Sequence, residues 1–246
     1  MLIEERQRAI LEYIKEKPDL KVAELAKLLF VSEPTVRRDL TELHNKKLIT
    51  KRYGGIILGQ PTADREIPFL LRENEGSSAK NEIGRRAAEL VEDGMVIMLD
   101  GSTSAYHLIP YLQNKKDIIV VTSGAKTAVA LAEANIKTFS TGGKMIINSY
   151  SYVGDGAEDF VRRFNADILF FSCRGVSLDG DMSDLSIEEA SLRRVMFTRA
   201  KKKILLAAKE KIGKSYFYSM GNISSIDGIV CEGDLPDEIS YKMARL

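Results

Sequence analysis

Small hydroxyl residues and glycines gather at four places in residues 95–175, each after a segment that reads as a strand. The four clusters are Asp100-Gly101-Ser102-Thr103-Ser104, Thr122-Ser123-Gly124, Thr141-Gly142-Gly143-Lys144 and Ser172-Cys173-Arg174-Gly175. Each cluster alone is more often a turn and a helix cap than a binding site. The first two also open helical patterns, and free amides at a helix N-terminus together with hydroxyls suit a bound phosphate. Four such clusters at one edge of a sheet favour a pocket.

This expected pocket needs positive charge in addition to amides and hydroxyls. Lys211 and Arg174 are the residues expected to supply it. The full set of expected effector-binding residues is Asp100, Ser102, Thr103, Ser104, Thr122, Ser123, Gly142, Gly143, Arg174 and Lys211. Four acids, Asp179, Asp181, Asp184 and Glu188, either bind sugar hydroxyls or form only a turn and the solvated start of a helix.

Catalysis and metal binding find little support in the sequence. Acid–base catalysis on a sugar needs a positioned carboxylate base and a second acid–base group. Asp184 and Glu188 are candidates, but no spaced pair of acids marks them. The chain has two histidines and two cysteines, too few for a metal site, and Cys173 and Cys231 are expected to be buried thiols. We therefore expect no catalytic residues, no metal and no cofactor.

A second group of residues that could bind a partner lies in residues 31–46. Ser32 is a good N-cap, and Val36, Leu40 and Leu43 recur at helical spacing. The opposite face of this helix is small, polar and cationic, as a helix in the DNA major groove requires. The residues expected to contact DNA from this helix are Ser32, Pro34, Thr35, Arg37, Arg38, Thr41 and Asn45.

Residues 48–58 read as a β-hairpin that turns at Gly54-Gly55. A basic hairpin beside a recognition helix is a wing, and Lys51, Arg52 and Tyr53 are expected to reach phosphates or the neighbouring minor groove. Two further helices, at about residues 4–17 and 22–29, precede the recognition helix. The alternative is a three-helix packing module whose charges are simply solvated. DNA binding is favoured because the N-cap, the apolar face and the basic face of this helix and the basic hairpin all fit a winged helix-turn-helix.

Strand-like and helical segments alternate from residue 79 onward. Strands are expected at residues 95–99, 118–122, 136–140, 167–172, 203–207 and 228–230, and helices at 81–92, 103–113, 125–133, 158–164 and 187–200. This alternation predicts an α/β fold with a mostly parallel sheet, and ligands bind at the carboxyl ends of the strands in such sheets. The expected domains are a winged helix-turn-helix at 1–58, a linker at 59–78 and an effector-sensing α/β domain at 79–246.

The run Val31-Ser32-Glu33-Pro34-Thr35-Val36-Arg37-Arg38-Asp39-Leu40, followed by Leu43 and Tyr53-Gly54-Gly55, closely resembles the helix-turn-helix signature of the DeoR-type bacterial transcription regulators. The resemblance continues across the second domain and implies a sensor fold similar to sugar-phosphate isomerases, with a phosphorylated sugar as effector. The chain departs from the family pattern at Lys47, Tyr53, Ser102 and Ser123, and at Ala208, where the family commonly has an aspartate.

The distribution of charge fits a small DNA-binding domain joined to a larger domain. Residues 1–60 carry 12 Lys/Arg against 9 Asp/Glu, a net charge of +3, and the remaining residues carry 24 against 26, a net charge of −2. The charged N-terminal residues do not resemble a signal peptide, and the apolar runs are too short to span a bilayer. A cytoplasmic location is therefore expected.

Three functions are compatible with these features. The favoured one is a homo-oligomeric transcription regulator, a repressor of sugar-metabolism genes, that binds a double-stranded DNA operator and responds to a phosphorylated sugar. The second is a sugar-phosphate isomerase-like enzyme with a DNA-binding appendage. The third is a DNA-binding protein whose second domain only oligomerises.

Overall fold

The computed structural model describes residues 3–17, 20–45, 49–52, 55–58 and 68–243. The chain forms two compact units, Met1–Leu71 and Arg72–Leu246. The expected wing residue Tyr53, the turn at Lys47 and the first part of the expected linker, 59–67, lie outside the described residues.

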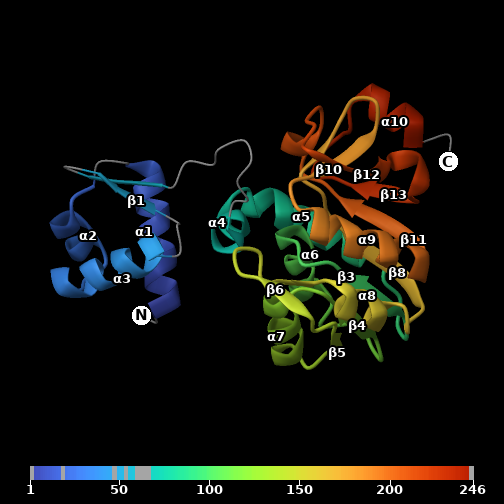
Figure 1. The fold of residues 1–246 in the computed structure, drawn as a ribbon, viewed down its shortest axis with the longest axis horizontal. Coiled ribbons are helices and arrows are strands. Elements are labelled where there is room, and N and C mark those ends of the chain that lie inside the picture. Colours follow the sequence, from blue (N-terminus) through green and yellow to red (C-terminus); the bar gives the residue numbers. More distant parts are fainter. Residues whose placement is uncertain (1–2, 18–19, 46–48, 53–54, 59–67, 244–246) are drawn as a thin grey trace. The chain divides into compact units, whose positions relative to one another are not determined.

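The first unit contains the expected three helices and hairpin (Figure 1). The helices are α1 (Ile3–Glu16), α2 (Val22–Leu28) and α3 (Glu33–Asn45), and β1 (Ile49–Arg52) pairs antiparallel with β2 (Gly55–Leu58). Val36, Leu40 and Leu43 point into one apolar core with residues of α1 and α2. The side chain of Ser32 accepts a hydrogen bond from the Thr35 amide at 3.4 Å, so the predicted N-cap of α3 is confirmed.

The second unit is built on a six-stranded parallel sheet with the strand order β13-β11-β8-β3-β4-β5. These strands are β3 (Val96–Leu99), β4 (Ile119–Thr122), β5 (Lys137–Ser140), β8 (Ala166–Phe171), β11 (Ala200–Leu206) and β13 (Gly228–Val230). All five neighbouring pairs are parallel. The predicted mostly parallel α/β fold is therefore confirmed.

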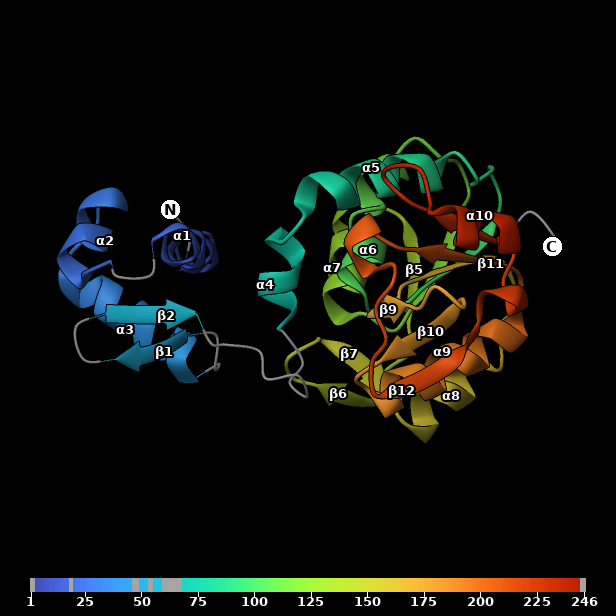
Figure 2. The ribbon, with the colours of Figure 1, turned by 90° about the horizontal axis from the view of Figure 1, so that it is seen from above.

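Alternate residues of each central strand point to opposite faces of the sheet, as the period of two requires. Ile97, Leu99 and Phe170 belong to one buried cluster, whereas Met98 and Leu169 belong to another. Figure 2 shows the corresponding layers, with α5 (Ser77–Ala88) and α7 (Ala125–Glu133) on one face and α8 (Asp155–Val161) and α9 (Ile187–Arg199) on the other. The strands read as continuous apolar runs because both faces are covered.

Several elements of the second unit differ from the expectation or were not predicted. The described part of the expected linker contains α4 (Phe69–Asn74) and the start of α5, which begins four residues earlier than expected, after Gly76 in a left-handed conformation with φ of 62°. The expected helix 103–113 is instead α6 (Thr103–Tyr106) followed by the 3₁₀ turn η1 (Ile109–Tyr111), because Pro110 interrupts an α-helix.

Three short antiparallel strands and one hairpin complete this unit together with a C-terminal helix. β9 (Gly175–Val176), β10 (Asp181–Asp184) and β12 (Tyr218–Asn222) form a small sheet, and β6 (Lys144–Ile146) pairs with β7 (Ser151–Val153). The remaining elements are the 3₁₀ turns η2 (Lys209–Lys211) and η3 (Ile223–Ser225) and the helix α10 (Asp237–Met243). The acids at 179–184 were expected either to bind sugar hydroxyls or to form a turn and a solvated helix start. They instead include the strand β10, whose Asp184 is buried.

A buried ion pair ties α1 to α3 in the first unit. The Nε atom of Arg6 donates to Asp39 Oδ2 at 2.5 Å, and Nη2 donates to Oδ1 at 3.1 Å. The side chain of Asp39 is 1% exposed. The hydrogen bond to this carboxylate raises the pKa of Arg6 above its usual value despite the opposing effect of burial. The aspartate of the Arg37-Arg38-Asp39-Leu40 run is therefore a structural residue on the inner face of the helix.

We predict that Asp39→Ala lowers the free energy of unfolding of the first unit by about 1.5–3 kcal/mol, because charge-assisted hydrogen bonds are lost and the Arg6 guanidinium is left without its partner. Hydrogen–deuterium exchange of peptides from α1 and α3 in urea measures this change. The matched control is Glu33→Ala, which removes an exposed carboxylate from the same helix and is expected to have little effect. Equal exchange in Asp39→Ala and the parent protein would contradict the prediction.

Candidate functional site

The four clusters of hydroxyl residues and glycine meet at one edge of the sheet. The strands that precede them, β8, β3, β4 and β5, are consecutive neighbours and all run parallel. Their carboxyl ends therefore lie side by side, as the sequence predicted. This is the edge at which ligands bind to open parallel sheets.

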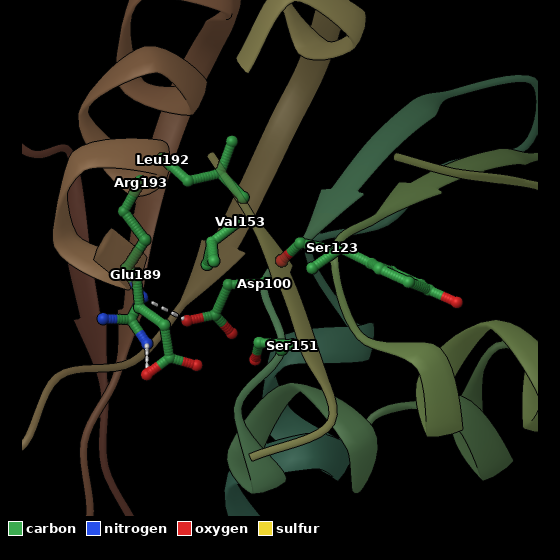
Figure 3. Close-up of a pocket in the computed structure, with 9 residues that line it drawn as sticks. Asp100, Ser123, Ser151, Val153, Glu189, Leu192 and Arg193 are labelled. Carbon is green, nitrogen blue, oxygen red and sulfur yellow. Dashed lines mark hydrogen bonds and ion pairs between the residues drawn. The ribbon is translucent and has the colours of Figure 1, made fainter. Parts of the chain in front are cut away.

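A pocket with about 180 Å³ of empty space, part of it open solvent, lies at this edge (Figure 3). The residues that line it are Asp100, Gly101, Ser123, Ser151, Tyr152, Val153, Glu189, Leu192 and Arg193. Figure 3 shows Ser123 and Ser151 on one side of Asp100, and Glu189, Leu192 and Arg193 of α9 on the other. The pocket is thus bounded by strand-end loops, the β6–β7 hairpin and one helix.

Arg193 is the centre of a buried charge network. Its Nε donates to Asp100 Oδ2 at 2.8 Å, its Nη1 donates to Asp184 Oδ2 at 2.7 Å, and its Nη2 lies 3.9 Å from Glu189 Oε2. Burial alone would lower the pKa of Arg193, but the three carboxylates outweigh it and raise the pKa above its usual value. Of these three acids, Asp100 and Glu189 line the pocket beside Arg193, so this wall is rich in carboxylate oxygens.

Asp100 also fixes the loops on both sides of the central strand. Its Oδ1 accepts the amide of Ser102 and its Oδ2 accepts the amide of Ser172, each at 3.1 Å. These bonds join the end of β3 to the end of β8. A single carboxylate therefore sets the relative position of two of the four predicted clusters.

The opposite wall of the pocket carries a buried hydroxyl without a partner. Ser151 is 1% exposed, and its Oγ makes no hydrogen bond within the part of the chain that the structure describes. Gly101 makes room for it, since a Cβ atom at residue 101 would lie 2.0 Å from this oxygen. Ser104, the last residue of the first cluster, and Thr127, in the helix after the second cluster, also have buried hydroxyls without a described partner. Unsatisfied groups of this kind are rare and commonly mark a place where a ligand or water binds.

The other predicted effector residues surround the strand ends but do not line this pocket. Ser102 caps α6 by accepting the Ala105 amide at 3.1 Å, and Thr122 Oγ1 accepts the Gly124 amide at 3.1 Å. Thr103, like Ser104, is a buried residue in the first turn of α6. Gly142 and Gly143 lead into β6 and have φ angles of 63° and 103°. Glycine adopts such positive φ angles more readily than other residues.

The two cations expected to hold phosphate have protein partners. Lys211 Nζ donates to Ser172 Oγ at 2.7 Å, and burial lowers the pKa of Lys211. The Arg174 guanidinium lies 5.8 Å from the centre of the Tyr216 ring. Cys173, beside them, is a buried free thiol whose pKa burial raises to about 12, and Cys231 is also free and buried. Both cysteines are thus the buried thiols that the sequence predicted.

The acids Asp184 and Glu188, considered above as an acid–base pair, lie in different environments. Asp184 is bound to Arg193, whereas Glu188 is an exposed residue that pairs with Lys144 at 2.8 Å. Glu189, which the sequence analysis did not select, lines the pocket instead. One signal for it was present, because Glu189 and Arg193 are one helical turn apart and oppositely charged.

The expected DNA-contacting face of α3 is exposed. Ser32, Pro34, Arg37, Arg38 and Thr41 are exposed and Thr35 is half-buried. Arg37 lies 3.4 Å from Glu33, whereas Arg38 forms no ion pair with any described residue. Asn45 lies in α3, and Lys51 and Arg52 lie in β1, but their side chains are outside the described part of the structure.

A winged helix-turn-helix with an exposed cationic face, joined to a parallel-sheet unit with a polar pocket at its strand ends, defines the class of ligand-responsive DNA-binding regulators. Residues 6–62 match the DeoR-like helix-turn-helix domain, and residues 75–233 match the DeoR C-terminal sensor domain. The chain belongs to the DeoR family and is a DNA-binding transcription regulator. No described helix is long and apolar enough to cross a membrane.

Relatives with similar sequences extend over nearly the whole chain. The uncharacterized HTH-type transcriptional regulator YulB of Bacillus subtilis is 31% identical over 98% of this chain and 93% of its own length. The glycerol-3-phosphate regulon repressor of Escherichia coli K12 is 25% identical over 94% of this chain and 92% of its own length. Both names describe transcription regulators, not enzymes.

Solved structures resemble parts of the chain at low sequence identity. The eIF2B delta structure from Chaetomium thermophilum has a TM-score of 0.50 at 18% identity and covers 67% of this chain and 59% of its own. Ribose 5-phosphate isomerase A from Methanocaldococcus jannaschii has a TM-score of 0.43 at 15% identity and covers 56% and 55%. The chain spans little more than half the length of these proteins. At 18% identity, the likeness to the eIF2B delta structure concerns the fold alone.

We predict that Arg38→Ala lowers the preference for operator over unrelated DNA by about 1–3 kcal/mol if the guanidinium contacts a base. Arg52→Ala in the wing is the contrasting variant. It is expected to weaken binding to both DNAs alike and to reduce the slope of log K against log salt by about 1. Fluorescence anisotropy with both DNAs at several salt concentrations measures these effects. Unchanged discrimination in Arg38→Ala would exclude this arginine from base recognition.

Proposed function

We propose that this regulator represses genes of sugar metabolism and that a phosphorylated sugar bound at the strand-end pocket modulates its affinity for the operator. The observation that carries the proposal is the pocket itself. It combines acids held by Arg193 with the buried, unpartnered hydroxyl of Ser151. Acceptors on one wall suit sugar hydroxyls, and donors on the other suit a phosphate.

The orientation of the ligand follows from this polarity. Asp100 and Glu189 face the sugar hydroxyls, and the phosphate lies toward the clusters at 102–104 and 122–124. Asp100, Ser102, Thr103, Ser104, Thr122, Ser123, Gly142, Gly143, Arg174 and Lys211 remain the proposed effector-binding set, to which Ser151, Glu189 and Arg193 are added. Lys211, which donates to Ser172 Oγ at the end of β8, is proposed to supply positive charge to the phosphate.

The DNA-binding half of the proposal assigns Ser32, Pro34, Thr35, Arg37, Arg38, Thr41 and Asn45 to the major groove and Lys51, Arg52 and Tyr53 to the wing. One small reader contacts few base pairs, so we propose that copies of the chain associate on a repeated or inverted operator. A protein with this role works in the cytoplasm. The E. coli relative named as a repressor supports the sign of regulation.

We predict that one compound from a panel of sugar phosphates raises the melting temperature of the protein, because ligands that bind only the native state stabilise it. The panel contains ribose 5-phosphate, fructose 1-phosphate, fructose 6-phosphate, tagatose 6-phosphate and glycerol 3-phosphate, each beside its unphosphorylated form. Stabilisation at a concentration of 100 times Kd is about 2.7 kcal/mol. The same compound is expected to weaken operator binding.

Ser151→Ala is expected to weaken the active compound about 10-fold, since one hydrogen bond contributes about 1 kcal/mol or more. The variant without ligand is expected to be as stable as the parent protein, because this hydroxyl has no described protein partner to lose. Ser149→Ala is the matched control: Ser149 is also buried and unpartnered but does not line the pocket. Calorimetry compares the three proteins. Equal affinity in all of them, or a panel without an active phosphate, would contradict the proposal.

A further inference from the structure

Glu73 in the last turn of α4 is held by residues that follow both of the first two strand-end clusters. The first cluster opens α6, and His107 at the end of that helix donates from Nε2 to the Glu73 carbonyl at 3.0 Å. The second cluster opens α7, and Lys126 in its first turn places Nζ 3.6 Å from Glu73 Oε2. The Glu73 side chain is 8% exposed and that of Lys126 is 25% exposed, so this ion pair is screened less than a surface pair.

The same end of α4 is anchored from α5. Lys80 Nζ donates to the carbonyl oxygens of Arg72 and Glu75, which are acceptors that a helix C-terminus leaves unsatisfied. Burial lowers the pKa of Lys80 to about 8. Nδ1 of His107 lies 2.8 Å from Asn81 Oδ1, and a Cβ atom at Gly84 would lie 2.4 Å from the His107 carbonyl oxygen. The end of α6 therefore packs directly on α5.

The β6–β7 hairpin, which supplies Ser151 to the pocket, contacts Lys126. Lys126 Nζ lies 5.8 Å from the centre of the Tyr150 ring, and the Tyr150 carbonyl accepts the Ala125 amide at 2.8 Å. Gly124 and Ser151 also form an isolated β-bridge. Contacts therefore connect the β6–β7 turn and the start of α7 to Lys126, which in turn pairs with Glu73.

We propose that Glu73 and Lys126 transmit the state of the strand-end pocket to α4, and so regulate the affinity of the DNA-binding unit for its operator. The division between the two units falls within α4, between Leu71 and Arg72, so the chain that leaves this anchor leads into the DNA-binding unit. The inference rests on the proposed function, because it requires a ligand at the strand ends. A ligand changes operator affinity only by binding two conformations of the protein differently. Retention or release of Glu73 by Lys126 is the local difference between those conformations.

Lys126→Met tests this proposal because it keeps most of the side-chain stem and removes the charge. The matched control is Lys201→Met, which removes a lysine paired with Asp167 at 2.8 Å at the opposite, amino-terminal ends of β11 and β8. The full-length protein is used throughout, with the panel compound that raises the melting temperature of the parent most. Three quantities are measured: affinity for the compound, operator affinity without it, and operator affinity at saturation.

We predict that Lys126→Met binds the compound and the free operator within about threefold of the parent but loses most of the change in operator affinity on adding the compound, which is typically about 5- to 150-fold in coupled sites. Lys201→Met is expected to keep the parental response. A purely structural role for Lys126 would alter binding to operator or compound rather than their coupling. A full response in Lys126→Met overturns the proposal.

A second measurement separates failure of this proposal from failure of the proposed function. Hydrogen–deuterium exchange without ligand is expected to be faster across residues 69–75 in Lys126→Met than in the parent or in Lys201→Met. This arm needs no effector, so it decides whether Lys126 anchors α4 even where no panel compound binds. Unchanged exchange in Lys126→Met overturns the proposal, whatever the panel shows.

Discussion

The arrangement of the sensor unit depends on the buried guanidinium of Arg193. It draws together α9, the end of β3 and strand β10, through bonds to Asp100 and Asp184 that span 93 and 9 residues of sequence. Removing one partner from such a network typically costs about 3–5 kcal/mol, because a charge is left buried and unpaired. The network is therefore a geometric constraint as much as a source of stability. It fixes which residues of α9 face the strand ends. Asp100 in turn accepts backbone amides from the loops after β3 and β8 and so fixes their positions.

Much of this fold follows from local sequence patterns. The six parallel strands were predicted from short segments that end at a turn or cap. The central strands β3, β4 and β8 are apolar because both faces of the sheet are covered there. The strand-end clusters at residues 100–104 and 122–124 were predicted for the same reason, since a hydroxyl, a glycine and a helix start are all local features. Their meeting at one edge needed only the rule that parallel strands end on the same side.

The rest of the site was not predictable from one sequence because it depends on distant pairings. Ser151 reaches the pocket through a hairpin of two three-residue strands, and no hydrophobic alternation marks so short a segment. Arg193 lies in a helix whose neighbours are not given by its own pattern. In α3, by contrast, periodicity places Asp39 three residues after Val36 on the inner face. Only its partner, Arg6, 33 residues earlier in the chain, had to come from the structure.

The polar strand ends also explain where the sensor unit departs from ideal packing. Ser104, Thr127 and Ser151 have buried hydroxyls without a partner among the residues that the structure describes. The hydroxyl of Ser151 lies close to Gly101, and that of Thr127 lies close to Gly124. Each unsatisfied group costs free energy, and such defects persist only where the surrounding structure over-determines them. Here the surrounding structure is the double-sided sheet core and the Arg193 network. α6 and α7 begin at these same groups and contact Glu73 of α4 through His107 and Lys126. Under the proposed coupling, a ligand that satisfied these hydroxyls would therefore act on α4, the helix that leads to the DNA-binding unit.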